Sequence, residues 1–460
     1  MRSRAQTSPI VSLISLGCAK NTVDSERILA GFVRAGWLFA EDPSDADLCL
    51  VNTCGFIADA REESRKTLKT LAQARRRGRP RKIVALGCLV ERAATAPETG
   101  AALFEADARV GFADYARLPE ICGDLLADAS TPEPATAGRA SILPAPFHEE
   151  PRLLTGAPHF AWLKISEGCS NRCAFCSIPL IRGRQVSRAA EDIVREARQL
   201  ADSGVKEIAL IAQDTTSYGW DRPGEPDLAA LLARLSDALD PDLWLRVMYA
   251  HPKRLTDDLL RAMRDLPNLC PYLDLPLQHI SDPMLRSMGR GMTRAQTLRR
   301  LDRIREIWPE AVLRTTFIAG YPGETEADVE ALLDLIREGR FLHAGVFAFS
   351  PEPGTRAERL PDRVPVAEAE RRRNLLLLEQ QQVSRKLLAA WIGREIEVLI
   401  DGPSEARAGE WVARARWQAP EVDGVVRLSP GKTARRRPGP VRPARILRTR
   451  AYDLIAELCG

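Results

Sequence analysis

The sequence predicts an α/β protein with an N-terminal doubly wound parallel sheet, a central partial barrel of six β/α units and a small C-terminal β-barrel. Short apolar runs rich in Val, Ile and Leu alternate with segments of helical periodicity through most of the chain. That alternation is typical of parallel sheets. After a long helical segment at residues 366–393, the chain changes to short β-like runs separated by Gly and Pro, as in small barrels.

The first hundred residues repeat an apolar run that ends in a cysteine, in VSLISLGC, ADLCLVNTC and RKIVALGC. The carboxyl ends of parallel strands share one edge of a sheet, and ligand sites lie beyond that edge. The pattern therefore predicts that Cys18, Cys54 and Cys88 converge there as a metal site. The alternative is a buried structural cysteine, as we expect for Cys49. Each of the three, however, lies beside a glycine at a strand-to-loop junction.

A second group of cysteines lies in KISEGCSNRCAFCSIPLIRGR, where Cys169, Cys173 and Cys176 form a C-x3-C-x2-C run. A structural zinc site would need four tetrahedral ligands, and the nearest upstream histidine, His159, is ten residues before Cys169. A disulfide would leave an odd cysteine and would need an oxidising compartment. The spacing favours an iron–sulfur cluster over zinc or chance. With three thiolates, a four-iron cluster keeps one iron open.

The central region contains six apolar runs with helical segments between them, which predicts a partial barrel whose working edge lies at the carboxyl ends of its strands. The cysteine loop follows the first of these strands and is therefore expected at that edge. Polar residues and one glycine fall at the other strand ends: Gln213, Asp214, His251, Gln278, His279 and Gly320. We expect Phe175 and Tyr218 to serve in packing, and Cys122, Cys270 and Cys459 to be structural or incidental thiols.

Composition and charge indicate an ordinary globular protein, with 45% hydrophobic and 28% charged residues. The N-terminus does not resemble a signal peptide and no apolar run reaches membrane-spanning length, so we expect a cytoplasmic protein without a membrane partner. The last sixty residues contain twelve basic and seven acidic side chains, an excess of five that by itself accounts for the net charge of +4. A further basic run at residues 74–82 is interpreted as a solvated surface.

Taken together, the motifs resemble a known family. EGCSNRCAFCSIP resembles the radical S-adenosylmethionine (SAM) superfamily, whereas SLGCAKNTVDSE, VNTCGFI and ALGCLVER are similar to the N-terminal domain of methylthiotransferases, and the tail resembles the TRAM domain that closes those enzymes. The resemblance covers nearly the whole chain. It implies four segments: a methylthiotransferase N-terminal domain at 9–125, a linker at 126–154, a radical SAM core at 155–385 and a TRAM domain at 386–457.

This resemblance implies two 4Fe-4S clusters. Cys169, Cys173 and Cys176 would hold the radical SAM cluster, whose open iron binds SAM. Cys18, Cys54 and Cys88 would hold the auxiliary cluster, which carries or supplies the sulfur. SAM would serve both as radical source and as methyl donor, and no catalytic residue is implied beyond the cluster ligands.

Gln213 and Gly320 are candidate SAM contacts, although polar strand ends are also common in barrels that bind no cofactor. The YPGE run after Gly320 could be a simple turn.

Two branches of the family modify different substrates: one an adenosine of tRNA next to the anticodon, the other an aspartate of ribosomal protein S12. AQDTTSYG, YLDLPLQH and APEVDGVV are similar to the second branch. That branch adds a methylthio group to the aspartate β-carbon. Its implied partners are S12, free or in the small ribosomal subunit, a reducing electron donor and a sulfur donor.

The strongly basic GKTARRRPGPVRPARILRTR departs from what a module that recognises a basic protein should present. It keeps two alternatives open, the tRNA branch and an RNA contact beside S12. A zinc-containing RNA-binding module without catalysis is the remaining reading.

Overall fold

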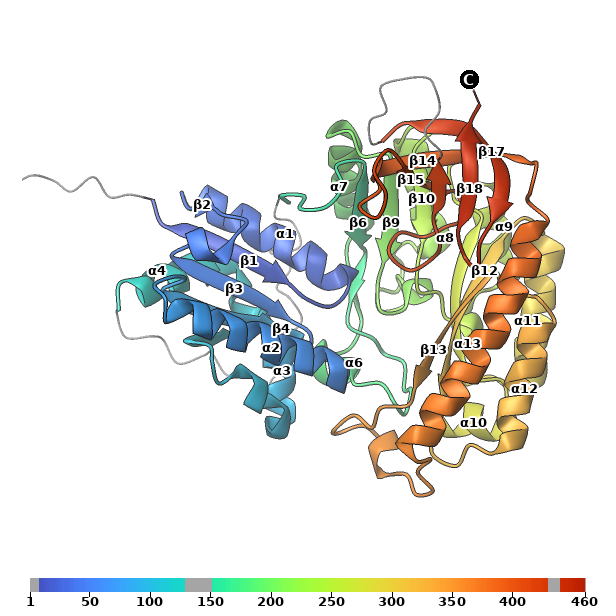
Figure 1. Cartoon of the computed structure of the whole chain (residues 1–460), viewed down its shortest axis with the longest axis horizontal. Helices are drawn as coiled ribbons and strands as arrows, with labels where there is room; N and C mark the ends of the chain where they lie inside the picture. Colours follow the sequence, from blue (N-terminus) through green and yellow to red (C-terminus); the bar gives the residue numbers. More distant parts are fainter. Residues whose placement is uncertain (1–7, 129–150, 429–438, 460) are drawn as a thin grey trace, which may run out of the picture.

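The computed structural model describes residues 8–128, 151–428 and 439–459 of the chain. Most of the expected linker at 126–154 and the arginines of the expected basic segment at 435–437 lie outside the described residues. Figure 1 shows three parts: an N-terminal sheet with its helices, a larger central domain, and a small barrel that packs against the central domain. The predicted architecture is confirmed in all three parts.

The N-terminal domain is a five-stranded parallel sheet in the order β2-β1-β3-β4-β5. Its strands and helices are β1 (Ile10–Ser15), α1 (Ala19–Arg34), β2 (Leu38–Phe39), β3 (Leu48–Thr53), α2 (Ala58–Arg75), β4 (Lys82–Gly87), α3 (Cys88–Thr95), β5 (Ala108–Val110) and α4 (Leu118–Leu126).

Helices cover both faces of this sheet, as the alternation of side chains along β3 shows. Leu48 and Leu50 pack with α1 and α4, whereas Cys49 and Val51 point to the other face and pack with α2 and α3. Every residue of β3 is buried, as is typical of a central parallel strand. Cys49 is therefore a core residue, as expected.

The central domain contains the six predicted strands, divided into two parallel sheets in the orders β10-β9-β6 and β11-β12-β13. Between β10 and β11 the ladder is interrupted, and the strand pairing there is one isolated bridge from Leu245 to Leu269. The strands are β6 (Phe160–Lys164), β9 (Glu207–Ile211), β10 (Trp244–Val247), β11 (Tyr272–Gln278), β12 (Val312–Ala319) and β13 (His343–Ala348), and a short antiparallel pair joins β7 (Ser166–Glu167) to β8 (Val186–Ser187).

Six helices of the central domain pack on the outer face of these strands and form the largest hydrophobic core of the described chain. They are α7 (Ala190–Asp202), α8 (Leu228–Ala238), α9 (Asp257–Asp265), α11 (Arg294–Ile307), α12 (Glu326–Arg337) and the long α13 (Val366–Ala389). Two short helices lie outside this core: α6 (Ile178–Ile181) contributes Ile181 to the cluster of the N-terminal domain, and α10 (Asp282–Ser287) contributes Met284 to a smaller cluster.

The inner face of the partial barrel is closed by its two neighbours. Trp162 of β6 and Trp244 of β10 point inward and share a cluster with Ala19 of α1 and Leu399 of the small barrel. That barrel is closed in the order β14-β15-β16-β18-β17, and its strands are β14 (Glu395–Pro403), β15 (Trp411–Ala415), β16 (Val426–Leu428), β17 (Val441–Thr449) and β18 (Leu454–Leu458). Both neighbours are thus part of the central core.

The small barrel also makes buried ion pairs with the central domain. Glu207, the first residue of β9, pairs with Arg414 of β15 and with Arg246 of β10. Because Glu207 is at the amino end of its strand, this contact lies at the end opposite the carboxyl-end loops. The small barrel therefore leaves the working edge at this strand free.

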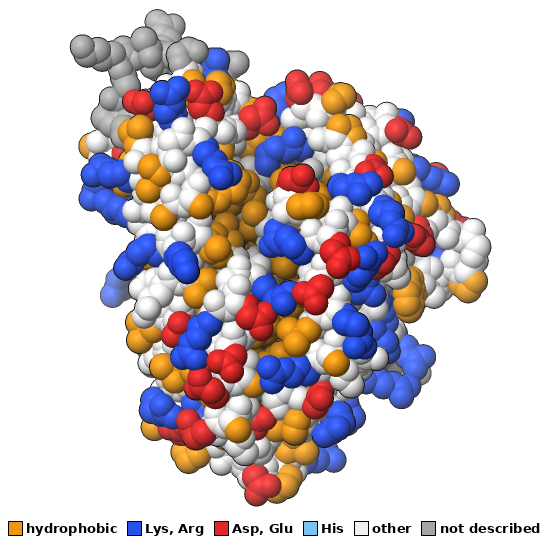
Figure 2. Space-filling model, turned by 90° about the vertical axis from the view of Figure 1, so that its right-hand side faces the viewer, with side chains coloured by type: hydrophobic (Ala, Val, Ile, Leu, Met, Phe, Trp, Pro, Cys, Tyr) orange, Lys and Arg blue, Asp and Glu red, His pale blue; other side chains and the backbone are white. Residues whose placement is uncertain are grey.

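Figure 2 shows a face on which acidic and basic side chains are interspersed, with hydrophobic side chains in a hollow near its centre. No large area of one charge sign dominates that face. Within the described ranges, none of the helices combines the length and the apolar composition that crossing a membrane requires.

Candidate functional site

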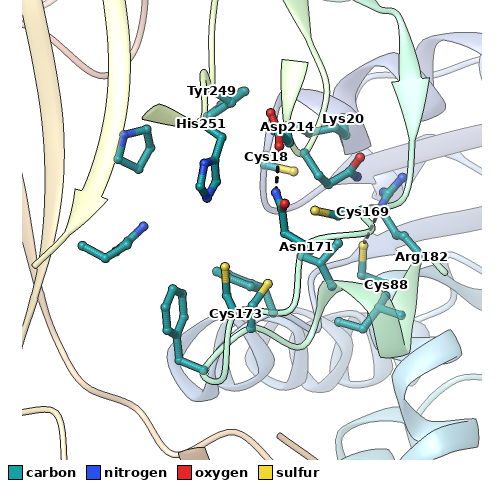
Figure 3. Close-up of a pocket in the computed structure, with 18 of the residues that line it drawn as sticks. Cys18, Lys20, Cys88, Cys169, Asn171, Cys173, Arg182, Asp214, Tyr249 and His251 are labelled. Atoms are coloured by element: carbon teal, nitrogen blue, oxygen red, sulfur yellow. Dashed lines mark hydrogen bonds between the residues drawn. The ribbon is translucent and has the colours of Figure 1, made fainter. Parts of the chain in front are cut away.

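All six predicted cysteines line one cavity of about 360 Å³ between the N-terminal domain and the carboxyl ends of the central strands. Figure 3 shows cysteines of both groups around this space. Its size is in the usual range for small-molecule sites. The lining residues comprise the six cysteines with apolar, cationic and strand-end side chains: Lys20, Phe56, Asn171, Phe175, Ile178, Ile181, Arg182, Gln213, Asp214, Tyr249, Ala250, His251, Pro276, Gln278 and Arg290.

The N-terminal cysteines come together because three strand ends approach each other closely. Cys54 follows β3, and Cys88 begins α3 directly after β4. A Cβ atom on Gly55 would lie 2.8 Å from the carbonyl oxygen of Cys88, and one on Gly17 would lie 2.9 Å from the Cβ of Cys54. Gly17 also has a φ of 95°, a region that favours glycine. The glycines beside the cysteines are thus required by close packing.

The second group is held by a loop that the surrounding chain fixes at several points. The Cys169 N–H donates to the Gly183 carbonyl at 3.1 Å, and the Ala174 N–H donates to the Met288 carbonyl at 2.8 Å. The β7–β8 pair closes the base of the loop. These bonds orient the loop so that its three thiols face the thiols of the N-terminal domain across one cavity.

The surroundings of these cysteines favour the neutral thiol, so a thiolate forms only where a positive charge compensates it. Burial raises the pKa of Cys88 to about 12 and that of Cys176 to about 12, and it also raises the pKa of Cys54 and Cys169. Neutral buried thiols lose their protons when a metal binds. Three thiols per group are soft ligands of the kind that iron–sulfur clusters use.

A guanidinium contacts one thiol in each group. Arg182 Nε donates to Cys88 Sγ at 3.3 Å, and Arg290 Nη1 donates to Cys173 Sγ at 3.3 Å. Such donors stabilise thiolate charge. Among the described ranges, no group of three His, Cys, Asp or Glu side chains is arranged to hold one metal ion.

Arg182 is also the centre of a buried ionic network that joins the two domains. Its guanidinium donates to Glu167 at 2.8 Å and to Asp24 of α1 at 3.2 Å, and Lys164 pairs with both carboxylates. The four side chains are at most 1% exposed. Because the network is complete, Glu167 keeps a pKa well below its usual range despite burial, through Arg182 and Lys164. The Gln213 amide donates to Glu167 at 3.0 Å, so this predicted strand-end residue is part of the same network.

Of the other predicted strand-end residues, three line the cavity and two lie outside its lining. Asp214, His251 and Gln278 line the cavity, and Asp214 accepts hydrogen bonds from Asn171 at 2.7 Å and from Arg254 at 2.6 Å. Burial, with nearby cations, lowers the pKa of His251, which keeps its imidazole neutral.

His279 and Gly320 lie outside the cavity lining. Both contact Glu324: the Gly320 N–H donates to it at 2.8 Å, and a ring nitrogen of His279 is 3.3 Å from it. A Cβ atom on Gly320 would collide with Ala369 of α13, which accounts for the glycine. The YPGE run is a turn, since the Glu324 N–H donates to the Tyr321 carbonyl at 2.9 Å.

The aromatic residues and two further cysteines that were expected to serve in packing lie in or beside apolar clusters. Tyr218 is in the main core, and its hydroxyl donates to the Arg188 carbonyl at 2.8 Å. Phe175 packs beside a small cluster and also lines the cavity. Cys122 and Cys270 are buried, each in an apolar cluster.

Sequence reasoning missed three cationic residues of the site: Lys20, Arg182 and Arg290. Lys20 lies within SLGCAKNTVDSE and Arg182 within KISEGCSNRCAFCSIPLIRGR, so proximity to the cysteines was an available signal. Lys20 is 7% exposed, and its Nζ lies 3.4 Å from the centre of the Tyr249 ring. Burial lowers the pKa of Lys20 to about 8.

Comparisons with known proteins agree with this site. Residues 163–336 match the radical SAM superfamily, residues 11–107 match Uncharacterized protein family UPF0004, and residues 392–459 match the TRAM domain. Among solved structures, the fold is similar to the radical S-adenosylmethionine methyltransferase TsrM from Kitasatospora setae, with a TM-score of 0.52 and 17% identity over 76% of this chain and 74% of that chain. At that identity the likeness concerns the fold alone. The fold and the cysteine loop define a radical SAM enzyme, a class that uses SAM and a 4Fe-4S cluster.

Relatives that match over nearly the full length of the chain show which family of radical SAM enzymes it belongs to. The chain is 45% identical to a protein of Synechococcus sp. (strain RCC307) over 100% of this chain and 92% of the relative. It is 41% identical to one of Syntrophus aciditrophicus over 97% of this chain and 98% of the relative. Both relatives are called ribosomal protein uS12 methylthiotransferase RimO. The chain belongs to the RimO family of radical SAM methylthiotransferases.

Proposed function

We propose that this chain is the ribosomal protein S12 methylthiotransferase of its cell, which uses SAM to add a methylthio group to the β-carbon of an aspartate of S12. The observation that carries the proposal is the convergence of two cysteine groups, from different domains, on one cavity. A reaction that must generate a radical and also deliver sulfur needs both functions beside the same substrate carbon. A binding module would not require this arrangement.

Two 4Fe-4S clusters are part of the proposal. Cys169, Cys173 and Cys176 would hold the cluster that binds SAM, and Cys18, Cys54 and Cys88 would hold the auxiliary cluster. When bound, these groups would supply the electron for cleavage of SAM into methionine and a 5′-deoxyadenosyl radical, and the sulfur for the product. Six thiols and two guanidinium donors are the residues present in this structure that fit such groups.

The protein's own side chains would place the reactants and exclude water. Arg182 and Arg290 each stabilise negative charge on one thiolate group through their hydrogen bonds to Cys88 and Cys173. The apolar wall shields reactive species from solvent, and it is formed by Phe56, Phe175, Ile178, Ile181 and Pro276.

The partners proposed are S12, free or in the small ribosomal subunit, a reducing electron donor and a sulfur donor, in the cytoplasm. The TRAM match and the basic segment at 431–450 support an additional contact with RNA. Replacing Arg435, Arg436 and Arg437 by Gln should weaken binding to small subunits and reduce its salt dependence. Unchanged binding would show that the segment makes no RNA contact.

The deciding experiment begins with anaerobic iron and sulfide analysis of the reconstituted protein. Near eight irons per chain are expected, falling to about half after Cys169→Ala/Cys173→Ala/Cys176→Ala. Mass analysis of S12 and of tRNA after reaction with SAM then identifies the substrate. A methylthio group on S12 alone supports the proposal, whereas modification of tRNA supports the other branch. Zinc without iron would contradict radical chemistry altogether.

A further inference from the structure

Three cationic side chains among the described residues line the cavity, and they differ in how their charge is compensated. Arg182 donates to Glu167, Asn21 and Cys88, and Arg290 donates to Cys173 and to the Pro276 carbonyl. Within the described part of the chain, the Lys20 ammonium has neither an ion pair nor a hydrogen-bond acceptor and rests instead on the Tyr249 ring. Lys20 is thus the one cavity cation whose donors remain available to a ligand.

Lys20 is 7% exposed, so its ammonium is only partly hydrated, and no ion pair with a described residue offsets that loss. The cation–π contact with the Tyr249 ring recovers part of that loss. The remaining donors point to a ligand that the protein binds during its reaction. Since the donor group is an ammonium, an anionic oxygen is the matching chemistry.

The backbone beneath this ammonium is held in an unusual conformation. Five described residues other than glycine have positive φ, and two of them, Tyr249 at 60° and Gln278 at 73°, line this cavity. The Tyr249 N–H donates to Asp274 at 3.2 Å, and its carbonyl accepts from the Thr215 N–H at 3.1 Å. These bonds hold the ring under Lys20. Strained positions of this kind cluster at ligand sites.

The position of Lys20 also suits one particular reacting group. It is two residues after Cys18, on the first turn of α1, and it lines the same cavity as Cys169, Cys173 and Cys176. In an aspartate side chain, the β-carbon is bonded directly to the carboxylate carbon. A carboxylate bound at Lys20 therefore keeps the carbon to be modified within one bond of the bound group, inside the space that both cysteine groups line.

We propose that Lys20, supported by Tyr249, binds the side-chain carboxylate of the acceptor aspartate and thereby selects an anionic residue as substrate. This inference rests on the proposed function, because it assumes that a protein carboxylate enters the cavity. An asparagine of the same shape, or a nucleobase, would leave the ammonium unpaired and would be rejected for that reason. The other carboxylate that could reach Lys20 is that of SAM itself, and the experiment separates the two.

The experiment measures binding of S12 and of S12 carrying Asn at the acceptor position to the anaerobically reconstituted enzyme, together with SAM binding and 5′-deoxyadenosine formation. The variants are Lys20→Met and Lys20→Arg. Lys253→Met is the matched control, because Lys253 is exposed and lies two residues beyond His251 of the cavity. The wild type should bind the Asp form about tenfold or more tightly than the Asn form.

Lys20→Met should lose that preference by weakening binding of the Asp form alone, while Lys20→Arg should keep part of it and Lys253→Met all of it. Retention of the preference in Lys20→Met at full iron content would overturn the proposal. Loss of SAM binding with the preference intact would assign Lys20 to the SAM carboxylate and overturn it equally. If Lys20→Met loses iron, the test relies on the wild-type enzyme alone. Equal binding of the Asp and Asn forms of S12 to the wild type would then contradict a carboxylate-binding site. A wild type that cleaves SAM yet neither binds nor modifies S12 would instead disprove the proposed function.

Discussion

The two cysteine groups face the same cavity, but the chain builds them in opposite ways. Cys169, Cys173 and Cys176 lie within eight consecutive residues of one loop. Cys18, Cys54 and Cys88 come from the ends of three strands, separated by 36 and 34 residues in the sequence. The loop group depends mainly on local chain geometry, whereas the N-terminal group depends on strand register and on domain docking. The N-terminal group should therefore be the more sensitive to changes away from the cysteines themselves.

Where the N-terminal domain docks on the central domain, side chains of each domain contact charged or thiol groups of the other. Arg182 belongs to the central domain but donates to Cys88, and Lys164 pairs with Asp24 of α1. A second buried contact has the same effect, since Glu352 after β13 pairs with Arg61 and with Arg92 of the N-terminal domain. Each domain thus supplies charges that the other needs, and separating the domains would leave buried carboxylates without partners.

The largest expected effect is the separation of the two functions by cysteine replacement. Cys18→Ala/Cys54→Ala/Cys88→Ala should abolish methylthiolation yet retain SAM cleavage, because the loop cysteines remain. Cys169→Ala/Cys173→Ala/Cys176→Ala should abolish both reactions. Iron content, 5′-deoxyadenosine and S12 mass provide the readouts. Loss of SAM cleavage in both triple variants at half iron content would contradict the division of roles.

The second largest effect is expected on the free energy of unfolding, when either of the two arginines that contact a thiol is replaced. Arg182→Met removes the cation from buried Glu167 and Asp24 and should cost about 3–5 kcal/mol of unfolding free energy. Arg290→Met removes hydrogen bonds to Cys173 and to one carbonyl, and about 1–3 kcal/mol is expected. Urea denaturation of the two variants under anaerobic conditions measures both values. Equal losses would indicate that the ionic network does not stabilise the domain junction.

A smaller effect should follow from adding one methyl group at the strand ends. Gly55→Ala places a Cβ 2.8 Å from the Cys88 carbonyl, so the strand ends must shift, at a cost of about 1–3 kcal/mol. Iron should fall towards half because the N-terminal group is displaced. Gly123→Ala is the control, since it lies in α4 of the same domain and nothing is within 4 Å of its Cβ position. Full iron in Gly55→Ala would show that the strand ends tolerate separation.

The smallest effect is expected on the outer surface of the same domain. Glu62→Gln breaks the exposed pair with Arg65 on α2, a helix that begins four residues after Cys54. Exposed pairs of this kind contribute little. The denaturation midpoint and the iron content should therefore match those of the wild type. A measurable loss of iron would mean that the N-terminal group responds to any change in this domain.

Several features of the site could be predicted from the sequence, and others could not. The loop of Cys169, Cys173 and Cys176 was evident from spacing, and the alternation of strands and helices placed Cys18, Cys54 and Cys88 at one sheet edge. The break between β10 and β11 was not predictable, because both strands carry the same apolar pattern as their neighbours. His279 and Gly320 were expected at the working edge, but contacts with Glu324 and Ala369 place them outside the cavity lining.

The sequence by itself determined the family, the order of the three folded parts and the identity of the six thiols, because periodicity and cysteine spacing are local properties of a chain. Only the tertiary structure decided that the two groups line one cavity, that Arg182 of one domain contacts Cys88 of the other, and that the Lys20 ammonium lies over the Tyr249 ring. These relations depend on how the domains dock. Docking is the sum of many weak contacts between residues far apart in sequence, which a linear pattern does not record.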